Sequence, residues 1–253
     1  MTISLLGALE IVVRTDPGLV REQNEDSVFA DANHALAILA DGMGGYNAGE
    51  VASSMATTLL SARLGAAFRS TAAHQTDSRT GQPFARQCLL DQIAAVNLAI
   101  FRASEGQSQF GGMGTTLVAA VFCNDQVVVA HVGDSRLYRL RGEEFVAMTH
   151  DHSVLQEQID SGLISAEEAQ YSPHRNLVTR AVGVEAEVDT EIHVYPVRPG
   201  MSICSAPMAS TIWSMRNKST DRWSDIRIIW NSQRRIWCRW RTRMAAMTTF
   251  RWC

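Results

Sequence analysis

The distribution of glycine and tryptophan divides this chain of 253 residues at Gly200. All 17 glycines lie at or before that residue, and all six tryptophans lie after it. Residues 1–200 hold 13 arginines, no lysine and 24 acidic residues, whereas residues 201–253 hold ten basic and two acidic residues. The first segment is long enough to bury a sizeable core. We therefore expect an ordered fold before Gly200 and, after it, either a second module or the product of a damaged reading frame.

Composition excludes several classes of protein. Apolar residues make up 46% of the chain and charged residues 19%, which excludes a disordered chain. The net charge of −3 argues against nucleic-acid binding driven by charge. No apolar run reaches the roughly 18 residues of a membrane span, and the N-terminal residues do not resemble a secretory signal. The five cysteines are scattered without a CxxC pair, which suits a reducing compartment and predicts a cytoplasmic protein.

Hydrophobic periodicity before Gly200 predicts alternating groups of strands and helices. Three strands are expected over residues 9–15, 27–31 and 35–40. Four helices are expected over residues 47–68, 85–104, 151–162 and 165–170. Four more strands are expected over residues 116–122, 126–132, 136–140 and 144–148. Because the turns between these last four are short, we expect them to form an antiparallel meander.

Four clusters of acidic residues or glycines lie at the ends of expected strands. They occupy residues 21–26, 41–45, 111–116 and 133–136. Carboxylates beside glycines suit hard cations such as Mg²⁺ or Mn²⁺, which can generate a water nucleophile. An arginine nearby can bind a phosphate through two hydrogen bonds. The third cluster lacks the lysine of a Walker loop, so it does not predict nucleotide binding.

Each cluster alone has a simpler interpretation. Asp-Gly is a common turn, and a carboxylate can cap a turn or lie at a solvated strand end. His131 and His152 are expected to be structural histidines and not metal ligands. The order and spacing of the four clusters together favour a metal site.

Five motifs carry a resemblance to the bacterial metal-dependent protein phosphatases of the PPM (type 2C) family. They are DPGLVREQNEDS at residues 16–27, LADGMGG at 39–45, GGMGTTL at 111–117, HVGDSRLYRL at 131–140 and THDHS at 149–153. The resemblance covers roughly residues 10–202, in the order of the family. It implies an α+β fold, a central sandwich of two antiparallel β-sheets flanked by helices on both faces, with a flap segment at about 153–180.

The resemblance also implies an activity. Phosphoserine and phosphothreonine in proteins would be dephosphorylated by a metal-bound water at a two-metal centre, without a phosphoenzyme. Arg21 would bind the substrate phosphate. Met43 stands where some family members carry a histidine as a candidate general acid, so that role is unfilled here. The implied partners are phosphorylated proteins, including a cognate Ser/Thr kinase and its substrates.

The implied cofactors are two Mn²⁺ or Mg²⁺ ions and a weaker third. Asp41 would bridge two ions, and the carbonyl of Gly42 would bind one of them. Glu25 and Asp26 would support the ions directly or through water. Asp134 would help to hold the third ion.

The tail departs from the family. The family continues with an Asp-Gly motif and ends with an Asp-Asn motif, which complete the metal site, and neither occurs after Gly200. Residues 203–214 can be back-translated into all their possible codons and read again in the frame that starts at the third base of each codon. This frame allows the sequence LLCSDGLNDMV, and its glycine is required whichever codons are used. Residues 244–253, treated in the same way, allow the sequence GGHDNVSVV, and its aspartate is required whichever codons are used. One lost base, or two gained, near codons 201–203 would explain both results.

We therefore expect a phosphatase domain over residues 1–202 and an aberrant, frame-shifted tail over 203–253. The last strands of the family fold are expected to be missing, and the chain as written is expected to be impaired. A basic, Trp-rich binding tail is the alternative for the second segment. For the whole chain, the alternatives are a non-catalytic remnant that binds phosphopeptide or metal and a metallohydrolase with another substrate.

Overall fold

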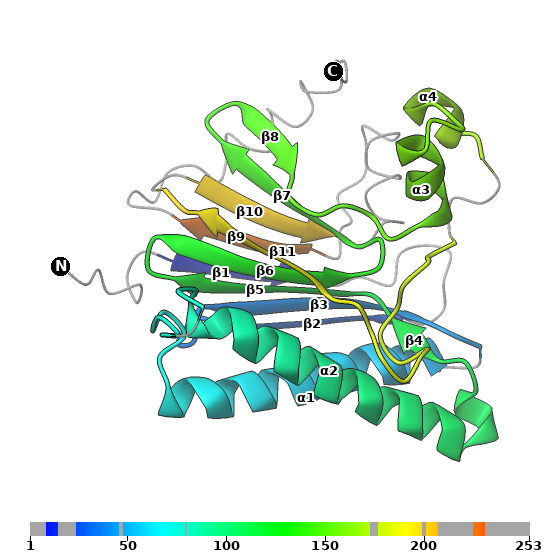
Figure 1. The fold of residues 1–253 in the computed structure, drawn as a ribbon, viewed down its shortest axis with the longest axis horizontal. Coiled ribbons are helices and arrows are strands. Elements are labelled where there is room, and N and C mark those ends of the chain that lie inside the picture. Colours follow the sequence, from blue (N-terminus) through cyan, green and yellow to red (C-terminus); the bar gives the residue numbers. More distant parts are fainter. Residues whose placement is uncertain are drawn as a thin grey trace.

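Two antiparallel β-sheets face each other in the computed structural model, which describes residues 9–14, 24–45, 48–78, 80–172, 177–198, 201–206 and 225–230 (Figure 1). The first sheet contains, in spatial order, β1 (Leu9–Arg14), β11 (Asp225–Trp230), β10 (Met201–Ala206), β7 (Arg136–Arg141) and β8 (Glu144–Ala147). The second contains β2 (Asp26–Asp31), β3 (Leu36–Met43), β5 (Leu117–Cys123), β6 (Gln126–Val132) and β9 (Glu191–Pro196). The short β4 (Gly114–Thr115) pairs with the end of β3. The predicted α+β sandwich is confirmed.

Two long helices cover the outer face of the second sheet (Figure 1). They are α1 (Ala48–Ser70) and α2 (Phe84–Gly106), close to the two ranges predicted from periodicity. Ala52, Ala56, Leu60 and Leu64 form a fully buried stripe on α1. Their four-residue spacing keeps them on one face, and the alanines allow the helix to approach the sheet closely.

The remaining described helices are short. A 3₁₀ turn, η2 (Ser108–Phe110), follows α2. The helices α3 (Val154–Asp160) and α4 (Ala166–Ala169) confirm the two short helices predicted in the flap region. The hydroxyl of Ser165 caps α4 and the carboxylate of Glu168 reaches back to the Ser165 backbone, a capping box that fixes where α4 begins.

The central strands of the second sheet are buried on both faces. In β3, Leu36 and Ile38 pack toward the helices, whereas Ala37 and Leu39 pack toward the first sheet. This double burial explains why these strands read as continuous apolar runs. It also fixes the register of β3, because a slip of one residue would exchange its two faces.

The predicted four-strand meander is wrong at its centre. β5 and β6 form a hairpin in the second sheet, and β7 and β8 form a hairpin in the first. The other side of β6 is occupied by β9, so the chain crosses between the sheets after Val132. Gly133 makes this crossing with a φ of +98°, a conformation that glycine adopts at little cost. The crossing turn carries Asp134.

The tail contributes to the first sheet. β10 spans the boundary expected after residue 202, and β11 lies between β1 and β10. Residues 207–224 and 231–253, which make up the rest of the tail, lie outside the described part of the structure. Among the described residues, the tail therefore supplies β11 and residues 203–206 of β10, and both strands lie in the interior of this sheet.

Gly133→Ala is expected to lower the free energy of unfolding by about 2–3 kcal/mol. A Cβ there would lie 2.8 Å from Cγ2 of Thr116, and the backbone would be strained as well. Gly142→Ala is the matched control, because Gly142 also has a positive φ (+61°) but has open space around the added Cβ. Its expected loss is about 1 kcal/mol. Equal losses in urea unfolding would contradict the crowding at Gly133.

Candidate active site

The hairpin of β2 and β3 brings three acidic residues to one end of the second sheet. Asp26 and Asp41 are register partners across the hairpin. The amide of Gly42 donates to the carbonyl of Glu25 at 3.0 Å. Two clusters separated by 15 residues of sequence are thus joined by local pairing, as the sequence predicts.

The start of α1 packs directly against this end of the hairpin. A Cβ on Gly42 would lie 2.0 Å from the carbonyl oxygen of Gly49, and one on Gly49 would lie 2.8 Å from Oε1 of Glu25. The hydroxyl of Ser53 donates to the carbonyl of Glu25 at 2.6 Å. The two glycines therefore allow the start of α1 to pack directly against the end of the hairpin, beside the Glu25 carboxylate, where no side chain would fit.

Two threonines connect this hairpin to the crossing turn. Thr115 Oγ1 donates to the carbonyl of Asp41 at 3.0 Å, and the Asp41 amide donates to Thr116 Oγ1 at 3.1 Å. Thr116 Oγ1 also hydrogen-bonds with Ser135 Oγ at 2.8 Å. The end of the third sequence cluster therefore links Asp41 to the turn that holds Asp134.

Asp134 is buried, with 7% of its surface exposed. Burial and, next, the negative charge of Asp151 raise the pKa of Asp134 to about 6. Arg136 is bound to Asp151 instead, through Nε to Oδ1 at 2.8 Å and Nη2 to Oδ2 at 2.5 Å. A cation beside Asp134 would favour its charged form, so this position suits a metal ligand.

The oxygen donors at this end fit hard cations, but the described set is incomplete. Within the described ranges, His131, His152 and Glu191 form a group whose possible metal-binding atoms all lie within 4.8 Å of one another. The acidic residues named above do not form such a group among the described residues. The proposed phosphate ligand Arg21 lies outside the described residues.

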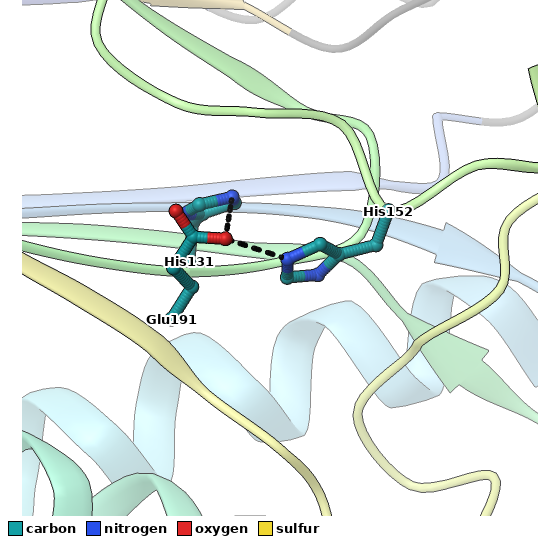
Figure 2. Close-up of side chains that lie close together, drawn as sticks. All are labelled: His131, His152 and Glu191. Atoms are coloured by element: carbon teal, nitrogen blue, oxygen red, sulfur yellow. Dashed lines mark hydrogen bonds and ion pairs between the residues drawn. The ribbon is translucent and has the colours of Figure 1, made fainter. Parts of the chain in front are cut away.

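The histidines have structural contacts, as the sequence analysis expects. His131 and His152 are buried, and their rings stack with centroids 4.7 Å apart. Figure 2 shows the Glu191 carboxylate beside both rings. Glu191 is not identified by any of the sequence motifs. It lies 39 residues beyond His152, and no motif connects the two positions.

No helix in the described part of the chain is both long and apolar enough to span a membrane.

Comparison with known proteins agrees with this geometry. The protein phosphatase 2C family model matches residues 20–182. The serine/threonine phosphatase stp of Listeria monocytogenes is 40% identical over 204 residues, covering 79% of this chain and 77% of that protein. The serine/threonine protein phosphatase PstP of Mycobacterium tuberculosis is 41% identical over 180 residues, covering 71% of this chain and 32% of that protein.

Solved structures show the same fold. A serine/threonine phosphatase of S. agalactiae superposes with a TM-score of 0.72 at 27% identity, covering 87% of this chain and 98% of that one. The catalytic domain of PstP in complex with two manganese ions gives 0.67 at 28% identity, covering 87% and 96%. By its sequence and its fold, this chain belongs to the protein phosphatase 2C family of serine/threonine protein phosphatases.

Proposed function

We propose that this sandwich hydrolyses phosphoserine and phosphothreonine in proteins at a centre for two Mn²⁺ or Mg²⁺ ions, located at the end of the β2–β3 hairpin. The observation that carries the proposal is the pairing of Asp26 with Asp41 beside the close contact between Gly42 and Gly49. Carboxylate and carbonyl oxygens, the donors that these cations prefer, gather at this end of the hairpin.

In this proposal, Asp41 and the carbonyl of Gly42 hold the ions directly. Glu25 and Asp26 orient them directly or through water, and Asp134 holds a weaker third ion. When bound, the ions supply a water nucleophile at neutral pH and neutralise charge on the phosphoryl group.

Arg21 binds the phosphate in this proposal, since a guanidinium matches two phosphate oxygens at once. The nearby hydroxyls are engaged elsewhere: Thr115 Oγ1 donates to a carbonyl, and those of Thr116 and Ser135 pair with each other. These contacts support direct transfer to water over transfer through a phosphorylated side chain.

We further propose that the complete domain ends in the frame-restored sequence and that residues 203–253 are aberrant. The two missing aspartates leave the metal pair short of carboxylates, so the chain as written is impaired. Substrates would be the phosphorylated products of a Ser/Thr kinase. The buried free thiols of Cys88 and Cys123 support a reducing compartment such as the cytoplasm.

The test uses the chain as written with a phosphothreonine peptide and saturating Mn²⁺, since excess ligand offsets weak binding. A slow, Mn²⁺-dependent release of phosphate is expected, and Asp41→Asn should abolish it. Asp189→Asn is the control, because Asp189 is exposed and forms an ion pair with the exposed Arg180.

The two alternative functions predict different results in the same assay. Peptide binding without release of phosphate would favour a non-catalytic remnant. Turnover of nucleotides or small phosphoesters without turnover of phosphopeptide would favour another metallohydrolase. A phosphopeptide rate that survives Asp41→Asn would contradict the proposed centre.

A further inference from the structure

His152 holds the crossing turn through two reciprocal hydrogen bonds. Its amide donates to the carbonyl of Gly133 at 3.0 Å, and the amide of Gly133 donates to its ring Nδ1 at 3.2 Å. The turn residue that follows is Asp134. His152 therefore fixes the backbone of Gly133, the residue directly before the proposed metal ligand Asp134.

The partners of the ring fix where its proton lies. Because Nδ1 accepts from an amide, the neutral ring carries its proton on Nε2 and donates it to Oε2 of Glu191 at 3.2 Å. Figure 2 shows this contact, with the carboxylate also facing His131. Glu191 therefore selects the tautomer in which Nδ1 can accept from Gly133.

The same pattern argues against a metal ion between these three residues. Nε2 of His131 donates to the carbonyl of His150 at 2.8 Å and lies 3.9 Å from Oε2 of Glu191. Both Nε2 atoms that face the carboxylate therefore carry protons, whereas a metal would need their lone pairs. The cluster is a hydrogen-bonded assembly.

Glu191 is itself held in place. Its other carboxylate oxygen accepts from Nε2 of His193 at 2.6 Å. Burial alone would raise the pKa of Glu191, but hydrogen bonds from His193 and His152 outweigh it and leave the pKa below its ordinary value. The carboxylate thus remains an acceptor at neutral pH.

We propose that His152 and Glu191 are positioning residues for Asp134. Glu191, on β9 of the second sheet, orients the His152 ring, and the ring holds Gly133 at the point where the chain crosses to the first sheet. The metal role of Asp134 rests on the proposed function, whereas the hold on the turn rests on the contacts above. Ligand carboxylates need such support, because small displacements weaken metal binding.

Two substitutions of His152 test separately its hydrogen bond to the Gly133 amide and its hydrogen bond to Glu191. In His152→Asn, the amide oxygen replaces Nδ1 and can still accept from Gly133, but no group reaches Glu191. In His152→Gln, the amide nitrogen replaces Nε2 and can donate to Glu191, but the acceptor for Gly133 is lost. Hydrogen exchange of the Gly133 amide should accelerate about tenfold in the Gln variant and less in the Asn variant.

The role of Glu191 is read from ¹⁵N shifts of the His152 ring in the full chain. Glu191→Ala should shift the ring toward a mixture of tautomers, since the acceptor for Nε2–H is gone. His193→Ala is the matched control, because it removes the other hydrogen-bond partner of Glu191 and leaves His152 unchanged. Unchanged ring shifts in Glu191→Ala, or unchanged Gly133 exchange in both His152 variants, would overturn the proposal.

Mn²⁺ titration tests the consequence at the site. Glu191→Ala should weaken the Mn²⁺ binding step that depends on Asp134 by about 10- to 100-fold. The same substitution should have no further effect in a chain that already carries Asp134→Asn. An equal, additive loss in that background would overturn the positioning role. If Asp134→Asn itself leaves Mn²⁺ binding unchanged, the proposed function of Asp134 fails, while the ring and amide signals still decide whether the linkage exists.

Discussion

Restoring the alternative reading frame from codon 203 should raise the Mn²⁺-dependent rate on a phosphothreonine peptide by on the order of a thousandfold. The described part of β10 ends at Ala206, which pairs with Arg136 on β7. The restored Asp codon overlaps codons 207 and 208, so its carboxylate would directly follow that strand end, beside the turn that holds Asp134. The second restored aspartate comes from the Asp-Asn motif near the end of the tail.

The control for this experiment is the restored chain with both of its new aspartates changed to asparagine. Its rate should fall back to that of the chain as written, because the fold is restored but the two charges are not. A rate for the chain as written that equals that of the restored chain would show that the tail does not limit activity. Sequencing the gene across codons 195–210 decides whether the base change is present in nature.

Arg136→Met should lower the free energy of unfolding by about 3–5 kcal/mol. Asp151 has 4% of its side chain exposed and accepts three hydrogen bonds from the guanidinium of Arg136, at 2.8, 3.0 and 2.5 Å. Without that cation, two buried carboxylates, those of Asp151 and Asp134, would face each other with no compensating charge. Urea unfolding at neutral pH measures the loss.

Arg180→Met is the matched control for Arg136→Met. Arg180 also pairs with an aspartate, Asp189, at 2.8 Å, but 43% and 78% of the two side chains are exposed. An exposed pair contributes about 0–1 kcal/mol, so the expected loss is small. Losses of similar size in the two variants would contradict the importance of the buried pair.

Local patterns predicted most single elements of this fold. The spacing of Val51, Met55, Leu59 and Ala62 predicts the helix that forms α1, but its fully buried stripe is the adjacent one of Ala52, Ala56, Leu60 and Leu64. The sheet to which a strand belongs is a non-local property, since it depends on which strand occupies its other edge. β9, almost 60 residues beyond β6, fills that edge, so the short turn at Gly133 joins two sheets and not two neighbouring strands.

In the candidate site too, contacts within one hairpin could be predicted from the sequence, whereas contacts between separate elements could not. Glu25, Asp26 and Asp41 come together through one hairpin, whose register follows from burial on both faces of β3. Asp134 reaches the same end through the Thr116–Ser135 contact, which only the motif resemblance anticipates. The support from Glu191 could not be predicted, because it depends on a hydrogen bond between residues on separate elements.

We propose that the protein is a two-metal phosphatase and that the chain as written lost part of its metal site with its reading frame. Equilibrium dialysis against Mn²⁺, followed by metal analysis of the chain as written and of the frame-restored chain, tests that claim most directly. We expect the restored chain to retain two Mn²⁺ ions at a concentration where the chain as written retains fewer, with Asp41→Asn emptying both. Equal numbers of bound ions in the two chains, or binding that survives Asp41→Asn, would contradict it.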